Sequence, residues 1–281
     1  MRIDLCGTRG STPAPGRDFV RYGGHTSCLA IRPDGATAPE LLLDAGTGIR
    51  AVTGLLASRP YRGAIALTHL HWDHTQGLPF FVGGDRDDAR VHLLLPAQEA
   101  GAGSAEAALA RAMSPPSFPI TPGQLRGDWT FDGLDPGLVR VGQLTLLARQ
   151  IPHKGGRTFG YRVGDGHSAI AYLPDHDPAE IGPGPDGLGV YHDAALELAE
   201  GVDVLCHDSF WYADDFDPAR TFGHAAAEYA IGLAAAAGAR RVLLLHHRPD
   251  RTDTELDKLA IGMQDGPVPV ALAADGEEII L

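Results

Sequence analysis

Four potential metal ligands lie within six residues of this chain, directly after an apolar run. The sequence Thr-His-Leu-His-Trp-Asp-His follows the apolar run Ala64–Leu67. An extended backbone sends the side chains of His69 and His71 to the same side, and Asp73 and His74 come where the chain can turn back. Imidazole and carboxylate suit zinc, and also manganese or iron. A polar surface loop is the competing interpretation, but chance gives this spacing only about once in a few hundred such chains.

Three more candidate ligands each come just past a segment of strand length. They are His153 after Leu144–Ile151, Asp175 after Ala169–Leu173, and His246 after Val242–Leu245. Taken alone, a histidine or aspartate at such a position is more often a solvated loop residue. Together with the histidine cluster, the three indicate a site at one rim of a sheet.

The rest of the chain alternates apolar runs with helix-like segments. The runs typical of strands are 41–43, 64–67, 91–95, 144–148, 169–173, 202–206 and 242–245. The helix-like segments are 48–58, 102–113, 193–200, 225–237 and 252–263. This order predicts an α+β fold of two sheets with helices outside. The proline-rich segment 114–123 is expected to be a loop rather than a linker, so residues 1–281 are expected to form a single domain.

Composition narrows the partners and the compartment. The chain has 36 acidic and 23 basic residues and a net charge of −13, whereas nucleic acid and anionic membranes are bound mainly through Lys and Arg. The three cysteines form no C-x-x-C pair, which fits a reducing compartment, and we expect a cytoplasmic protein. The longest nearly apolar segment, 225–239, contains Glu228 and is shorter than the roughly 18 residues of a membrane span. No membrane partner is expected.

Several segments together resemble the metallo-β-lactamase superfamily. The His-x-His-x-Asp-His cluster with later His, Asp and His at strand ends is its signature, and residues 41–48 resemble the strand before its first helix. Residues 7–15, 21–28 and 222–224 resemble the branch that contains ribonuclease Z and cyclic-phosphate phosphodiesterases. Residues 113–120 resemble a loop of small hydrolases in that branch. The resemblance implies a four-layer αββα sandwich, in which two mixed β-sheets pack face to face with helices outside.

The resemblance also implies two divalent metal ions, with zinc favoured and manganese or iron as alternatives. The implied ligands are His69, His71 and His153 for the first ion, Asp73, His74 and His246 for the second, and Asp175 as the bridge between them. In this family the two ions lower the pKa of a shared water, and the resulting hydroxide is the nucleophile.

Some of these positions have close rivals in the sequence. His247 competes with His246, and residues 176–177 compete with Asp175. The resemblance favours His246 and Asp175, because they match the family's positions after the strands. Asp44 is expected to orient a ligand imidazole through its other ring nitrogen, although a strand-end turn would also explain an aspartate there.

Catalytic roles follow from the same resemblance. His224, at the start of a helix, is expected to face the site and to donate a proton or stabilise charge, with a helix cap or surface histidine as the alternative. Asp73 is expected to be catalytic as well as a ligand. His207 and Asp208, at the end of the run 202–206, are expected to support His224 or a metal ligand.

Three further side chains are candidate substrate contacts. Lys154 and Arg157 follow the candidate ligand His153 and can pair with a phosphate, although a solvated turn would explain them too. His25 stands where the family commonly has Asn, and Lys154 where it often has Pro.

These features predict a dinuclear metal-dependent hydrolase, with a phosphodiesterase acting on a small or nucleotide-like phosphodiester favoured. The alternatives are a lactonase, thioesterase or β-lactamase-type hydrolase on the same metal core, and a non-enzymatic binding module. The sequence has neither the cysteine-rich zinc module of phosphonate-pathway phosphodiesterases nor a basic arm for tRNA. Structured RNA is therefore not an expected partner. A homodimer is compatible with the sequence.

Overall fold

The computed structural model describes residues 1–98, 103–263 and 266–281, and its strands form two seven-stranded sheets. In order across the first sheet, the strands are β14 (Glu278–Ile280), β1 (Arg2–Gly7), β2 (Cys28–Arg32), β3 (Leu41–Leu43), β4 (Arg62–Ala66), β5 (Arg90–Pro96) and β6 (Asp128–Leu134). Across the second they are β13 (Val270–Leu272), β12 (Val242–Leu245), β11 (Val204–Asp208), β10 (Ala169–Leu173), β9 (Thr158–Gly164), β8 (Leu144–Ile151) and β7 (Gly137–Val141).

Each sheet is antiparallel in one half and parallel in the other. The strands from β14 to β3 pair antiparallel, and those from β3 to β6 pair parallel. In the second sheet the strands from β7 to β10 pair antiparallel, and those from β10 to β13 pair parallel. Both sheets are therefore mixed, as predicted. In each parallel half the carboxyl ends of the strands meet at one edge.

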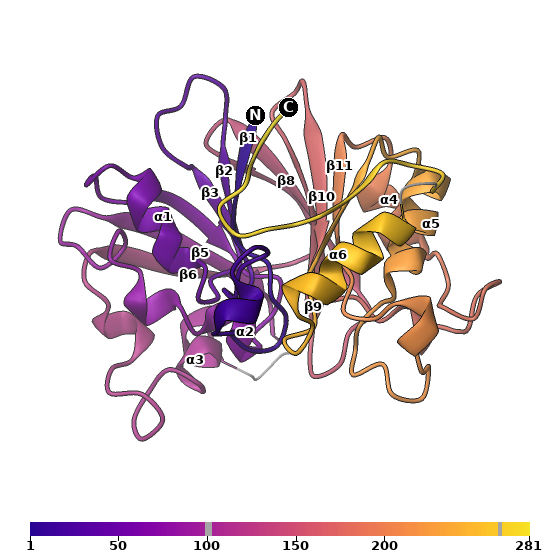
Figure 1. Cartoon of the computed structure of the whole chain (residues 1–281). Coiled ribbons are helices and arrows are strands. Elements are labelled where there is room, and N and C mark those ends of the chain that lie inside the picture. The colour runs from indigo at the N-terminus through magenta and orange to yellow at the C-terminus, as the bar shows by residue number, and fades with distance from the viewer. Residues whose placement is uncertain (99–102, 264–265) are drawn as a thin grey trace.

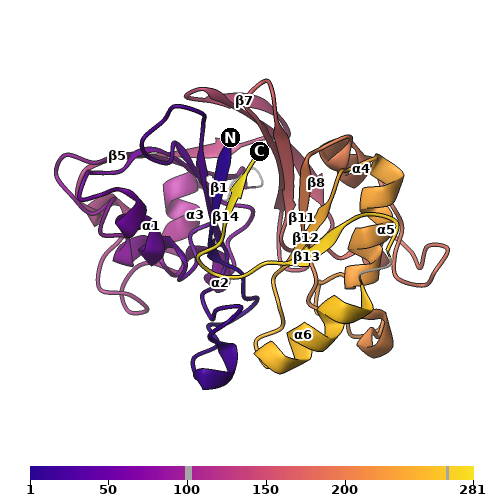
Figure 2. The same ribbon diagram turned by 45° about the horizontal axis from the view of Figure 1, so that its top comes forward.

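The described residues form the helices α1 (Ile49–Leu55), α2 (Trp72–Thr75), α3 (Ala105–Ala110), α4 (Asp193–Ala199), α5 (Ala227–Ala237) and α6 (Asp253–Gly262). Except for the one-turn helix α2, which carries Asp73 and His74, these helices cover the outer faces of the two sheets. The two sheets face each other, with α1 and α3 on the side of the first sheet and α4 and α5 on the side of the second (Figures 1 and 2). The predicted four-layer αββα sandwich is confirmed.

Three apolar clusters hold these layers together. The central cluster joins the facing sides of the sheets, for example Ile3 and Leu43 from one sheet and Tyr161 and Val204 from the other. A second cluster packs α4 and α5 against the outer face of the second sheet, and a third packs α1 against the outer face of the first. Burial of apolar surface on both faces of each sheet is the main stabilising contribution.

Several predicted element bounds need correction. The predicted helix 102–113 is observed as Ala105–Ala110, and residue 102 lies outside the described residues. The predicted helix 48–58 ends at Leu55, and the short helix α2 was not predicted. The reason is that α2 is a single turn, too short for an apolar periodicity to show. Within residues 1–98, 103–263 and 266–281, no helix has the length and apolar character that a membrane crossing would require.

Candidate metal centre

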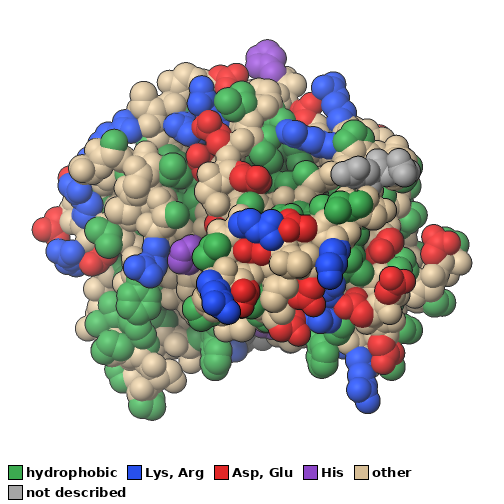
Figure 3. Space-filling view, viewed as in Figure 1, with side chains coloured by type: hydrophobic (Ala, Val, Ile, Leu, Met, Phe, Trp, Pro, Cys, Tyr) green, Lys and Arg blue, Asp and Glu red, His purple; other side chains and the backbone are tan. Residues whose placement is uncertain are grey.

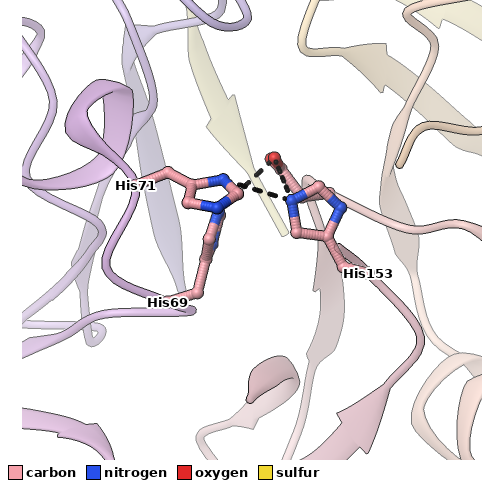
Figure 4. A group of neighbouring side chains, drawn as sticks. His69, His71 and His153 are labelled. Atoms are coloured by element: carbon pink, nitrogen blue, oxygen red, sulfur yellow. Dashed lines mark hydrogen bonds and ion pairs between the residues drawn. The ribbon is translucent and has the colours of Figure 1, made fainter. Parts of the chain in front are cut away.

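Loops that follow the strands bring the candidate ligands to one edge of the sandwich. The histidine cluster follows β4, Asp175 follows β10 and His246 follows β12, while His153 comes from the loop after β8. Figure 4 shows His69 and His71 on one side of the centre and His153 facing them from the other. The centre therefore joins the two sheets.

Two groups of four residues could each hold an ion. One ligand atom from each of four residues lies within 4.8 Å of the others in both groups, which are His69, His71, His153 and Asp175, and Asp73, His74, Asp175 and His246. Asp175 belongs to both groups. The seven residues that the sequence suggested as ligands are thus brought together, in the same two sets.

Contacts within the groups are close. In the first group Asp175 Oδ2 lies 3.6 Å from His69 Nε2 and 3.4 Å from His153 Nε2. In the second group Asp175 Oδ1 lies 3.0 Å from His74 Nε2 and 3.2 Å from His246 Nδ1. The two oxygens of this carboxylate therefore face different groups, as a carboxylate that bridges two ions would.

Buried polar atoms without a hydrogen-bond partner fit the presence of metal ions. His69 Nε2, His74 Nε2, His246 Nε2 and Asp175 Oδ1 are buried and have no such partner among the described residues. A buried polar atom that stays unpaired costs roughly 1–3 kcal/mol. Coordination of a cation by these lone pairs would remove that cost, so the donor set fits zinc and similar divalent ions.

The far nitrogens of two candidate ligand imidazoles are held by polar partners outside the ligand groups. His74 Nδ1 donates to Asp44 Oδ2 at 2.8 Å, and His153 Nδ1 donates to the Gly223 carbonyl at 2.6 Å. Each bond leaves the lone pair of Nε2 directed at the centre. Partners of this kind fix the tautomer of a metal-binding histidine and orient its ring.

Asp44 has a network of its own. Its carboxylate accepts hydrogen bonds from the backbone N–H and hydroxyl of Thr68 and from the Tyr172 hydroxyl, besides the bond from His74. Its backbone is left-handed, with φ of 61°, and that of His246 is similar, with φ of 59°. Such conformations are uncommon in residues other than glycine and occur at functional sites.

The charges of the centre favour a cation. Burial alone would lower the pKa of His74, but the carboxylates of Asp175, Asp73 and Asp44 outweigh it and hold that pKa well above its usual value. Burial would raise the pKa of Asp175, yet the surrounding imidazoles hold it well below its usual value. Asp175 therefore stays ionised, and the centre carries a negative field that attracts positive charge.

Glycines approach two of the candidate ligands closely. A Cβ on Gly10 would lie 2.4 Å from Cδ2 of His246, and a Cβ on Gly223 would lie 2.7 Å from Nδ1 of His153. Since real Cβ atoms essentially never come this close, any other residue at these positions would displace the imidazole. These glycines lie in the segments 7–15 and 222–224, which carry part of the resemblance to the metallo-β-lactamase superfamily.

His224 lies beside the centre and is bound by Asp208. Its Nδ1 donates to Asp208 Oδ2 at 3.0 Å, and its ring stacks on Phe210 at 4.4 Å between centroids. Asp208 Oδ2 also accepts the backbone N–H groups of His176 and Ala225. Burial would lower the pKa of His224, but Asp208 outweighs it and raises that pKa. His224 thus favours the protonated form, with Nε2 left for other partners.

The rivals of two candidate ligands point elsewhere. His247 Nε2 donates to the Ala273 carbonyl, so its ring lies outside both ligand groups. His176 Nδ1 is bonded to His207 Nε2 at 3.0 Å, and its Nε2 to His192 Nε2 at 2.8 Å. His207 therefore contacts His176, and not His224 or a candidate ligand as the sequence suggested, because its ring packs against His176 and against Tyr229 of α5.

The three candidate substrate contacts differ in position. Lys154 Nζ lies 3.3 Å from Thr221 Oγ1, on the loop that leads to His224. Arg157 lines the cavity next to His69 and His71, but its guanidinium is bonded to the Ala97 carbonyl and to Asp135. His25 lines a separate cavity beside the 13–24 loop.

Sequence reasoning missed several residues that shape the centre. Thr68 links Asp44 to His69 Nδ1, which lies 3.1 Å from its hydroxyl. Phe210 supplies the surface on which His224 stacks, and the Ser11 N–H donates to Asp73 Oδ2. The position of Thr68 directly before the histidine cluster could have been recognised in the sequence. The contact of Phe210 with His224 joins distant segments and has no sequence pattern.

Comparisons with known proteins agree with this geometry. The family model of the beta-lactamase superfamily domain matches residues 40–247, more than half of the chain. Ribonuclease Z of Lacticaseibacillus casei (strain BL23) is 29% identical, over 88% of this chain and 84% of the relative. The metallo-beta-lactamase fold protein YhfI from Bacillus subtilis has a TM-score of 0.67 at 20% identity, covering 99% and 98% of the two chains. A diphosphatase of the PhnP family has a TM-score of 0.67 at 19% identity, covering 100% and 97%.

The two solved structures show the same fold, and the family match covers the strands and loops that carry the centre, from β3 to His247. The chain belongs to the beta-lactamase superfamily, and it is a metal-dependent hydrolase.

Proposed function

We propose that this protein is a dinuclear metal-dependent phosphodiesterase that cleaves a small or nucleotide-like phosphodiester. The observation that carries the proposal is the pair of four-residue groups that share Asp175, with His224 beside them on its Asp208 support. The similar proteins named ribonuclease Z and PhnP-family diphosphatase are, by name, enzymes that act at phosphorus.

The ligand roles follow from the two groups. His69, His71 and His153 would hold one ion, Asp73, His74 and His246 would hold the other, and Asp175 would contact both. Imidazole with carboxylate favours zinc, with manganese or iron as alternatives. Two such ions, when bound, supply the positive charge that polarises a phosphoryl oxygen and lowers the pKa of a water.

His224 is the group proposed to act on the leaving oxygen. Asp208 accepts the Nδ1 proton, so Nε2 is the nitrogen that donates to the substrate. The raised pKa of His224 keeps a proton available for this step near neutral pH. The departing alkoxide of a dialkyl phosphate is strongly basic, so a proton donor placed here would have a large effect on its departure.

Asp73 is proposed to act in catalysis as well as to bind an ion. Its Oδ2 is fixed by the Ser11 N–H at 2.7 Å and lies 3.2 Å from His74 Nε2. We propose that the other oxygen, Oδ1, accepts a proton from an attacking water. Burial would raise the pKa of Asp73, but His74 outweighs it and lowers that pKa, so the carboxylate is ionised.

A small substrate fits the charge of the chain better than structured RNA does. The net charge of −13 opposes the binding of a large polyanion, because such binding depends on many Lys and Arg contacts to phosphates. We therefore propose a small-molecule diester as the substrate. We also propose a single domain over residues 1–281 and a cytoplasmic location. A homodimer stays a prediction.

A substrate panel tests the proposal. The zinc- and manganese-loaded protein is given bis(p-nitrophenyl) phosphate, a lactone, a thioester and a chromogenic cephalosporin, and a chelator-treated sample is the control. We expect metal-dependent turnover of the phosphodiester well above that of the other three. Turnover of the lactone, thioester or cephalosporin with none of the diester would refute the phosphodiesterase assignment and leave the hydrolase family intact.

A further inference from the structure

An aromatic cavity adjoins the proposed catalytic centre. It has a volume of about 510 Å³ and lies between α2, the segment that follows α2, and the loop after α3. Its aromatic lining comes from Trp72, Phe80 and Phe118. In the view of Figure 3, hydrophobic side chains gather at the lower left, where Figure 1 places α3 and the loop after it. A cavity of this size is in the range of small-ligand sites.

Two of the three aromatic rings in this cavity are exposed, and the third, Phe118, is half-buried. Trp72 is 75% exposed and Phe80 57% exposed, and Phe80 meets Phe118 edge to face at 5.9 Å. Among the described residues, Trp129 and Trp211 donate their indole N–H to backbone carbonyls, but Trp72 has no such bond. Exposed apolar surface of this kind is costly in water and marks binding sites.

The cavity lies next to a second cavity that borders the catalytic centre. It shares Leu109, Arg111 and Ala112 with a second cavity of about 270 Å³, which His69 and His71 line. Trp72 also directly follows His71 and precedes Asp73, at the start of α2. A ligand whose phosphate lies at the centre can therefore extend a flat group over Trp72.

We propose that Trp72, Phe80 and Phe118 form the subsite for the nucleobase of a nucleotidyl phosphodiester. This inference rests on the proposed phosphodiesterase function and narrows its substrate class to diesters with a nucleoside on one side. A base fits because both of its faces stack on aromatic rings. Gln76 and Ser117 add an amide and a hydroxyl to the lining, which can pair with the polar edge of a base.

Two esters with the same leaving group isolate the contribution of the base. The p-nitrophenyl ester of thymidine 5′-monophosphate carries a base, whereas methyl p-nitrophenyl phosphate does not. We expect the wild type to prefer the nucleoside ester in kcat/KM. Trp72→Ala and Phe118→Ala should each lower the ratio of the two kcat/KM values by roughly 5- to 100-fold, the range for loss of one base–aromatic stack. Leu138→Ala, an exposed residue on β7, is the matched control and should leave both values unchanged.

A binding measurement makes the two proposals separable. Calorimetric titration of the zinc-loaded protein with adenosine 5′-monophosphate and with ribose 5-phosphate needs no turnover. We expect tighter binding of the nucleotide, and loss of that difference in Trp72→Ala. If neither ester is hydrolysed but this preference is found, the phosphodiesterase function fails and the subsite stands. Equal binding of the two phosphates by the wild type would overturn the proposed nucleobase subsite. A kcat/KM ratio that neither variant changes would overturn it as well, and the cavity would then be open to assignment to another group, such as an acyl chain or a peptide.

Discussion

Replacement of His224 by alanine tests the proposed division between metal binding and leaving-group chemistry. The imidazole lies outside both ligand groups, so His224→Ala should keep the metals. It removes the proton that the Asp208 contact holds on the ring. The effect should therefore appear in turnover and not in metal content.

The size of the loss depends on the leaving group. A positioned general acid contributes roughly 10²–10⁴ in rate, which at about 1.4 kcal/mol per factor of ten is about 3–5 kcal/mol of transition-state stabilisation. That range applies to diesters with an alkyl or ribose leaving group, whose alkoxide is strongly basic. For p-nitrophenyl esters the loss should shrink, since that leaving group needs little protonation. His224 is buried and stacks on Phe210, so alanine also leaves a cavity, and the fold of the variant has to be checked.

Steady-state kinetics over a series of diesters with leaving groups of rising pKa give the answer. The loss in kcat/KM for His224→Ala should grow along the series, while metal content and circular dichroism match the wild type. The control is His167→Ala, at an exposed histidine outside both ligand groups, which should change neither kcat/KM nor metal content. An equal loss for every leaving group would mean that His224 stabilises phosphoryl charge or positions the substrate. Unchanged turnover on every diester would remove it from the mechanism.

Three further predictions concern the support of the centre and its surroundings. Asp44→Asn should weaken metal binding roughly 10- to 100-fold, measured by competition with a chelator, and an unchanged affinity would contradict its role in orienting an imidazole. Gly10→Ala should displace His246 and weaken metal binding in the same assay, whereas Gly54→Ala, which meets nothing within 4 Å, should not. Burial lowers the pKa of His247 to about 3, so between pH 3 and about 6.5 the unfolded chain holds a proton that the folded chain lacks. This group should then raise the free energy of unfolding by roughly 1.4 kcal/mol per pH unit over that range. His247→Gln should remove that part of the pH dependence, measured by urea unfolding. An unaltered pH dependence would contradict the lowered pKa of His247.

Strands that are buried on both faces were readable from the sequence. The runs 41–43, 169–173 and 242–245 coincide with β3, β10 and β12, because a strand covered on both sides is apolar at every position. Strands such as β1 and β6 were missed. Their residues alternate between the core and solvent, or they lie at an edge, so no apolar run marks them.

The candidate ligands were readable for a different reason. His69, His71, Asp73 and His74 lie close together in the chain, so their spacing carries the chemistry. The contact of Asp208 with His224, by contrast, depends on how β11 and the loop before α5 meet in space. The aromatic cavity is hidden for the same reason, since its walls come from α2 and from the loop after α3. Local patterns indicate which residues can bind a metal, but contacts between distant segments appear only in the fold.

The shared role of Asp175 is the central claim, and metal stoichiometry tests it most directly. After dialysis against zinc, the wild type should hold two ions per chain by mass spectrometry of the metal, and Asp175→Ala should fall well below two, with turnover lost in parallel. Asp177→Ala, in the same loop but outside both groups, should keep both ions and serves as the control. A folded Asp175→Ala protein that retains two ions and full turnover would contradict the assignment of Asp175 as the carboxylate common to both sites.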